Sequence, residues 1–278
     1  MATLWAWAVP TPFEDSPVDH TWVTDYDNRV NAYPNVAAVI AAQANYWFCW
    51  GDFHPDGSGA HQPKGYLGSA AGDLAWANCL CTSNASSASN LPTCGTIYHY
   101  GVDGVCHQLA NQVLWSTSAI PGSPLTVAKA RGYGLSTFFY GSYGLQHDAW
   151  SDRKTQCVPA GGQHAARGGT MKTAQPEDDE FVAKARAVLH GKDAEPKLAA
   201  LLAIRAQAHT TLAAHKAKIL LGAGSPSADE LNTAHRARLH QASRLLSADE
   251  FSALFGIAPG EIDKVQLVVP QMHSRSEK

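Results

Sequence analysis

The sequence predicts an α+β fold in which a mixed or antiparallel sheet is followed by an α-helical region. Short runs rich in β-branched and aromatic residues, bounded by Gly, Pro, Asp and Asn, dominate residues 1–158. Helical stretches lie between these runs without the regular alternation of a parallel βαβ repeat. After residue 175 the pattern becomes helical throughout, with capping motifs at the start of helices and glycines at their ends.

Four runs in the first part of the chain have the composition of strands. They are His20–Thr24, Tyr46–Trp50, Thr96–Tyr100 and Ser136–Tyr140. Helices are expected between them where apolar residues recur at helical spacing. These helices are Val36–Ala44, Asp73–Asn78 and Cys106–Ser116.

Residues 159–175 are rich in Gly, Ala, Gln and Thr and have no apolar periodicity, which is typical of a linker. The helical region, residues 176–260, is predicted to contain Glu177–His190, Pro196–Leu221, Ser227–Leu246 and Ser247–Phe255. The last two begin with a Ser-Ala-Asp-Glu capping box. The short connection between the two long helices favours an antiparallel hairpin. Residues 261–278 are expected to form a tail.

Composition excludes several classes of partner. The chain of 278 residues has a net charge of -3, which gives no electrostatic reason to bind nucleic acid or an anionic membrane. No apolar run is long enough for a membrane span, and the first ten residues lack the basic flank of a secretion signal. We therefore expect a soluble protein, either cytoplasmic or exported with its signal removed.

The six cysteines are compatible with disulfides or with free thiols. Cys79 and Cys94 flank a polar loop that a disulfide would tether. A structural zinc site is the main alternative to cysteine catalysis. Sulfur and nitrogen ligands are available from Cys79, Cys81, Cys94 and the Cys106–His107 pair. Their spacing does not repeat a CxxC pair, so no metal and no cofactor are predicted.

Cys106 is the candidate nucleophile. It follows the turn Gly101-Val-Asp-Gly104 and begins a predicted helix, where unpaired amides and the positive end of the helix dipole favour a thiolate. A thiol there tends to have a lowered pKa and to be nucleophilic at neutral pH. The alternative is a buried structural cysteine that opens an ordinary helix.

A nucleophilic cysteine needs a histidine to take and return its proton. His20, at the head of a predicted strand, is the first choice, because a sheet can present a base to the start of a helix. His99 is the alternative base. His107 follows Cys106 directly, and neighbours on a helix point about 100° apart, so it is a poor proton acceptor.

The His-first order resembles the circularly permuted branch of the papain-like NlpC/P60 superfamily, which includes the lecithin:retinol acyltransferase-like proteins. Asp19-His-Thr-Trp-Val23 matches its histidine strand, and Val105-Cys-His-Gln-Leu-Ala-Asn111 its cysteine helix, within residues 15–145. The acyltransferase-like group has a polar residue where this chain has Val105. The resemblance implies a papain-like sheet with a nucleophile-bearing helix.

Such a fold also implies a third group on a neighbouring strand that orients the histidine. Asp52 and His54 are the first candidates, followed by Asp25. The backbone amides of Cys106 and His107 are candidates for an oxyanion hole, because amides at a helix start point outward without reorganisation. Gln108 is a further candidate, although its amide could equally cap the helix.

The predicted function is that of a cysteine-dependent hydrolase of amide or peptide bonds that acts through an acyl-enzyme on a peptide or acyl-amide substrate. Acyl transfer on the same fold is the first alternative. The second is a non-enzymatic binding module, in which aromatic side chains form the binding surface and the helical hairpin docks a protein partner or a second copy of the chain.

Overall fold

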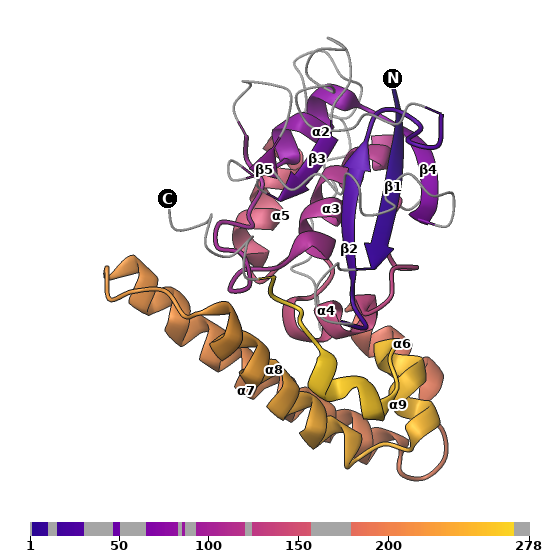
Figure 1. Ribbon diagram of the computed structural model, residues 1–278, viewed down its shortest axis with the longest axis vertical. Helices are drawn as coiled ribbons and strands as arrows, with labels where there is room; N and C mark the ends of the chain where they lie inside the picture. Colours follow the sequence, from indigo (N-terminus) through magenta and orange to yellow (C-terminus); the bar gives the residue numbers. More distant parts are fainter. Residues whose placement is uncertain are drawn as a thin grey trace.

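The computed structural model describes residues 2–10, 16–30, 47–50, 65–82, 85–86, 93–119, 124–156 and 179–269. Within these ranges the fold is α+β, as predicted, with the sheet in one half of the molecule and a layer of helices below it (Figure 1). In the same ranges, helices that combine the length and the apolarity needed to cross a bilayer are not found.

The described strands form one antiparallel sheet in the order β4-β1-β2-β3-β5. Their bounds are β1 (Ala2–Pro10), β2 (Asp19–Thr24), β3 (Trp47–Trp50), β4 (Tyr66–Gly72) and the two-residue β5 (Ala85–Ser86). The predictions at His20–Thr24 and Tyr46–Trp50 therefore correspond to β2 and β3. Strands β1 and β4 were not predicted, although Leu4 to Val9 alternate between the two faces of the sheet.

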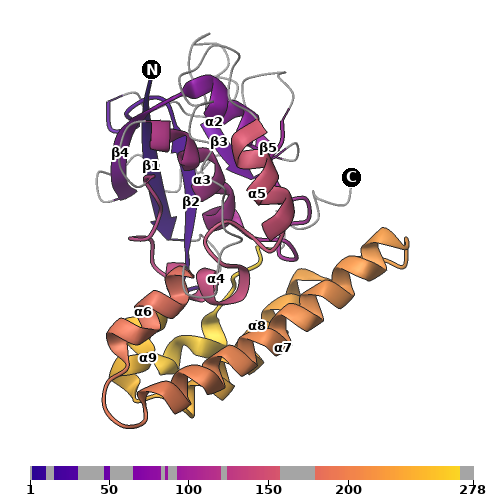
Figure 2. The same ribbon diagram turned by 180° about the vertical axis from the view of Figure 1, so that it is seen from behind.

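Helices cover one face of this sheet. Figures 1 and 2 show α3 (Cys106–Leu114) across the back of β2 and β3, with α2 (Leu74–Leu80) and α5 (His147–Gln156) beside it. Helix α3 continues into a 3₁₀ turn, η2 (Trp115–Ala119). The predictions of α2 and α3 are confirmed, α5 was not predicted, and the expected helix at Val36–Ala44 lies outside the described residues.

Two predicted strands are wrong. Thr96–Tyr100 forms only an isolated bridge from Tyr100 to Gly104, because the side chain of Gln112 on α3 bonds both Thr96 N and Thr96 Oγ1. Ser136–Tyr140 belongs to a helix, α4 (Tyr133–Tyr140). All eight of its residues are buried, so packing against the helices below overrides the β propensity of its aromatic residues.

The helical layer contains α6 (Glu180–Val188), α7 (Ala194–Leu220), α8 (Ala228–Ser243), α9 (Ala248–Phe255) and a 3₁₀ helix, η5 (Pro259–Lys264). Helices α7 and α8 run side by side as the predicted hairpin, which extends beyond the sheet (Figures 1 and 2). Helix α4 approaches α9 closely at Gly134. A Cβ at this position would stand 2.1 Å from the Leu254 carbonyl oxygen.

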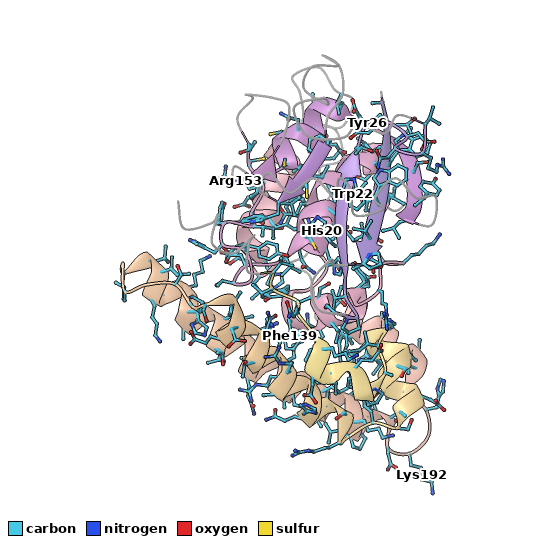
Figure 3. The ribbon with its side chains drawn as sticks, viewed as in Figure 1. His20, Trp22, Tyr26, Phe139, Arg153 and Lys192 are labelled. Carbon is cyan, nitrogen blue, oxygen red and sulfur yellow. The ribbon has the colours of Figure 1, made fainter. Side chains whose placement is uncertain are left out.

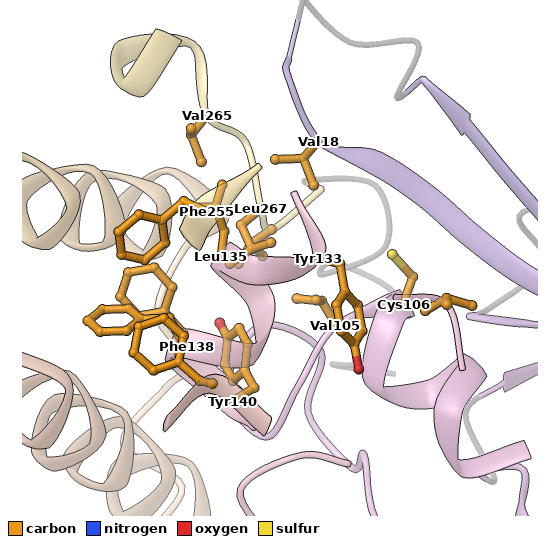
Figure 4. Packing of buried hydrophobic residues seen from close by; sticks show 14 of the residues in the cluster. Val18, Val105, Cys106, Tyr133, Leu135, Phe138, Tyr140, Phe255, Val265 and Leu267 are labelled. Atoms are coloured by element: carbon orange, nitrogen blue, oxygen red, sulfur yellow. The ribbon is translucent and has the colours of Figure 1, made fainter. Parts of the chain in front are cut away.

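One hydrophobic cluster joins the two predicted regions, as Figure 4 shows around Phe138 and Phe255. Phe138 on α4 packs against Phe181 on α6 and Phe255 on α9, with ring centroids 4.9 and 5.4 Å away. The predicted linker between residues 159 and 175 lies outside the described residues. The first residues of the predicted tail belong to the helical layer instead, because Ile262 and Val265 are buried in this cluster. Residues 270–278 lie outside the described residues.

Candidate functional site

Cys106 is the first residue of α3, where the sequence predicted it. Figure 4 shows its side chain leaving the first turn of the helix beside Val105. Val105 offers no capping side chain, so Gln108 closes the turn instead: its Oε1 accepts a hydrogen bond from Val105 N at 3.2 Å. Its Nε2 donates to the Gly141 carbonyl at 2.8 Å. Gln108 therefore caps the helix and is not available as an oxyanion donor.

Hydrogen-bond donors surround the Cys106 sulfur. The amide and hydroxyl of Thr21, the hydroxyl of Tyr100 and the amide of His107 all act to lower the pKa of the thiol. Thr21 Oγ1 is buried, and the Cys106 sulfur is the group that its hydroxyl faces. A thiolate at Cys106 would accept a stronger hydrogen bond from this hydroxyl than a neutral thiol does.

Burial works against these donors and is the larger effect, so the pKa of Cys106 lies above the ordinary value. The prediction of a lowered pKa is corrected on this point. It considered the helix start alone, whereas the side chain is only 4% exposed in the folded chain. Burial therefore keeps the Cys106 thiol neutral in the folded chain.

The sheet register determines where His20 points. His20 pairs with Val9 and shares its face of the sheet with Trp22, whose ring stacks on the imidazole at a centroid distance of 6.1 Å. Figure 3 labels both residues in the sheet half of the molecule. Thr21, the next residue, faces α3 and Cys106. His20 thus lies on the face of β2 away from Cys106, and its role as base for that thiol remains a prediction.

The structure instead brings His20 next to Cys49 of β3. His20 Nε2 and Cys49 Sγ are 3.1 Å apart, within hydrogen-bond distance, and both side chains are fully buried. Burial lowers the pKa of His20 to about 3 and, together with the nearby Cys106, raises that of Cys49 well above its ordinary value. The pair is therefore a neutral thiol and a neutral imidazole.

Cys49 was not predicted as part of the site, although the residue was expected in a strand. Side chains of a strand alternate between its two faces, and this period of two was the signal that could have pointed to Cys49. Once β2 and β3 are paired through Val23 and Phe48, Trp22 stands opposite Cys49, and His20 follows Trp22 on the same face. That deduction needs the register of the two strands, which the sequence alone does not provide.

His107 is fully buried and has a structural role. Its Nε2 lies 3.0 Å from the Asp19 carbonyl oxygen, which can only accept, so Nε2 carries the proton. Its Nδ1 contacts Ser136 Oγ at 2.8 Å. Burial lowers the pKa of this ring to about 4. Both ring nitrogens hold β2 and α4 against α3, and only the backbone amide remains as an oxyanion donor.

The other predicted site residues lie away from Cys106 or outside the described part of the chain. His99 directs Nδ1 to Asp103 Oδ2 at 3.1 Å, on the side of the turn that faces the helical hairpin. Asp25 directly follows β2 and is half-buried. Asp52 and His54 lie outside the described residues.

The other cysteines that the structure describes do not extend the site. The sulfurs of Cys79 and Cys94, which the sequence left open as a disulfide or as free thiols, are 3.4 Å apart. Cys157 lies outside the described residues. Cys81 is fully buried, and burial raises its pKa to about 12. Across the described ranges, no three potential metal ligands gather at one point.

Aromatic residues line the His20 face of the sheet. Trp7 stacks on Trp22, and its Nε1 donates to Thr24 Oγ1 at 2.8 Å. Trp7 and Trp22 are at most 1% exposed, so these two rings belong to the core.

Comparisons with protein-family models, curated proteins and solved structures found no match to this chain. The chemistry of the site therefore rests on its own geometry: a thiol at a helix start, a ring of donors around it, and a histidine on the adjoining strand.

Proposed function

We propose that this chain is a cysteine-dependent hydrolase of amide or peptide bonds, with Cys106 as the nucleophile. The observation that carries the proposal is the set of hydrogen-bond donors around the Cys106 sulfur, which includes the buried Thr21 hydroxyl. A thiolate or an oxyanion at this point would accept charge-assisted hydrogen bonds from these donors, and such bonds are stronger than those to a neutral thiol. The packing of α3 on an antiparallel sheet also supports the papain-like arrangement.

In the proposed reaction the Cys106 thiolate attacks the carbonyl carbon of an amide. The amides of Cys106 and His107 at the start of α3 would stabilise the resulting oxyanion. The thiol proton passes to the base and then to the leaving amine, and water releases the acyl group.

His20 is the proposed base. Its Nε2 lies 3.1 Å from Cys49 Sγ in the resting structure, and this contact would have to give way for Nε2 to exchange the proton. The ring lies on the other face of β2 from Cys106, so the proposal requires the start of that strand to rearrange. His20 is the second residue of β2, where a rearrangement would break few hydrogen bonds of the sheet.

Alkylation of the native protein with iodoacetamide from pH 5 to 9, mapped by mass spectrometry, tests both assignments. We expect Cys106 to react faster than Cys81, a buried thiol whose pKa of about 12 makes it the matched control. The His20→Ala variant should shift the pH dependence at Cys106 and leave that of Cys81 unchanged.

Two other outcomes of the alkylation, and one further experiment, are informative. Faster reaction at Cys49 than at Cys106 would move the nucleophile to the Cys49–His20 pair. Equal rates at Cys106 and Cys81 would contradict the hydrolase proposal. Incubation of wild type and Cys106→Ser with peptide amides, with and without an added amine acceptor, separates hydrolysis from acyl transfer by the product formed.

A further inference from the structure

The turn that leads into Cys106 is held by the helical layer. Tyr140 donates its hydroxyl to the Gly101 carbonyl at 2.6 Å and also contacts His235 Nε2 of α8 at 3.2 Å. Gly101 has a φ of 83°, and a Cβ there would stand 2.7 Å from Val268. The turn thus fits against α8 and the segment after η5 without room for a larger residue.

Asp103 is the charged group of this turn. Its side chain is 1% exposed, and it lies three residues before Cys106. Oδ2 contacts His99 Nδ1 at 3.1 Å and accepts the His99 amide at the same distance. Gln146 donates to Oδ1. A buried carboxylate is costly unless such partners surround it, so the partners of Asp103 determine the conformation of the turn.

The helical hairpin supplies a cation to this carboxylate. Lys216, near the end of α7, donates Nζ to Asp103 Oδ1 at 3.3 Å and lies 6.0 Å from the centre of the Tyr98 ring. Its side chain is half-buried, whereas Lys218, one half-turn further along the same helix, is exposed. Helix α7 therefore contacts the turn before Cys106 through the Lys216–Asp103 ion pair. The apolar packing on this turn comes from α8 and Val268.

We propose that the α7–α8 hairpin positions Cys106, with Lys216 as a positioning residue that acts through Asp103 on the turn before α3. A ligand or protein that displaced the hairpin would thereby change the reactivity of the thiol. The effect on catalysis rests on the proposed function, whereas the coupling between hairpin and turn does not.

The test compares Lys216→Met with Lys216→Arg, which retains the charge, and with Lys218→Met, which makes the same change at an exposed site. Hydrogen exchange of peptides covering residues 99–108 and the pH profile of Cys106 alkylation are measured on the full chain. We expect Lys216→Met to speed exchange in this segment and to change the Cys106 rate by about fivefold. The two other variants should match wild type.

Wild-type exchange and alkylation in a folded Lys216→Met would overturn the proposal, as would an equal effect of Lys218→Met. An inert Cys106 in every variant would count against the proposed function alone, because the exchange of residues 99–108 would still decide the positioning role. If Lys216→Met fails to fold, His99→Gln tests Asp103 from its other side: unchanged exchange in the turn would overturn the proposal.

Discussion

Three buried amide side chains hold α3 in place, and with it Cys106. Gln108, Asn111 and Gln112 are each at most 1% exposed and bond loop backbone on at least two sides. Asn111, for example, donates to the Ser142 carbonyl and accepts from Val127 N. Each such amide satisfies backbone groups that would otherwise be buried without partners. The position of the cysteine thus depends on polar side chains as much as on apolar packing.

Gln108→Met should lower the free energy of unfolding by about 2–4 kcal/mol, because it leaves Val105 N and the Gly141 carbonyl without their partner. Urea unfolding followed by far-UV circular dichroism measures this change. Gln207→Met makes the same replacement at an exposed position of α7 and should stay within about 0.5 kcal/mol of wild type. Similar losses in both variants would show that the Gln108 bonds contribute little.

The sequence was informative about the residues of the site and less so about their relations. The glycine turn and the helical spacing placed Cys106 correctly at the start of α3. The contact between His20 and Cys49 could not be deduced, because these residues are 29 positions apart and meet only through the β2–β3 register. The raised pKa of Cys106 also depends on tertiary burial, which a local motif does not reveal.

At the scale of elements, capping chemistry was predicted well. Ser247 Oγ accepts from Glu250 N at 3.2 Å, and Glu250 Oε2 accepts from Ser247 N at 2.7 Å, so α9 begins with the full capping box. Ser227 Oγ accepts from Glu230 N at 3.1 Å at the start of α8. The strand predicted at Ser136–Tyr140 was wrong, because no local signal in its aromatic residues distinguishes a buried helix from a strand.

Ser247→Ala should lower the free energy of unfolding by about 1 kcal/mol, the usual value of an N-cap serine. It removes the Oγ that accepts from Glu250 N, at a helix start where the Glu250 carboxylate also bonds Lys197 Nζ of α7 at 2.8 Å. Thermal unfolding measures the change. Ser227→Ala, which removes a cap without a salt bridge to another helix, is the matched comparison, and a larger loss there than at Ser247 would contradict this ranking.

At the scale of the whole molecule, the sheet and the helical layer share one core, and several histidines are buried in it. His20, His107 and His235 are at most 3% exposed. Burial lowers the pKa of His20 and His235 to about 3 and that of His107 to about 4. The folded chain keeps these rings neutral, whereas the unfolded chain protonates them below a pKa of about 6.5. Their effect on stability is therefore absent at pH 8 and becomes destabilising as the pH falls below 6.5.

We expect the free energy of unfolding to fall by about 1.4 kcal/mol per pH unit for each buried histidine between about pH 6 and 4. Three such groups would remove about 6 kcal/mol by pH 5, which is comparable to the whole stability of a typical domain. Urea unfolding at pH 7.5, 6.5 and 5.5 measures this slope.

His235→Leu, in the interface between α8 and α4, should reduce the slope by the contribution of one histidine, even if it lowers stability at pH 7.5. His190→Leu, at an exposed position, should leave the slope unchanged. A wild-type slope in His235→Leu would mean that this ring does not stay neutral in the folded chain.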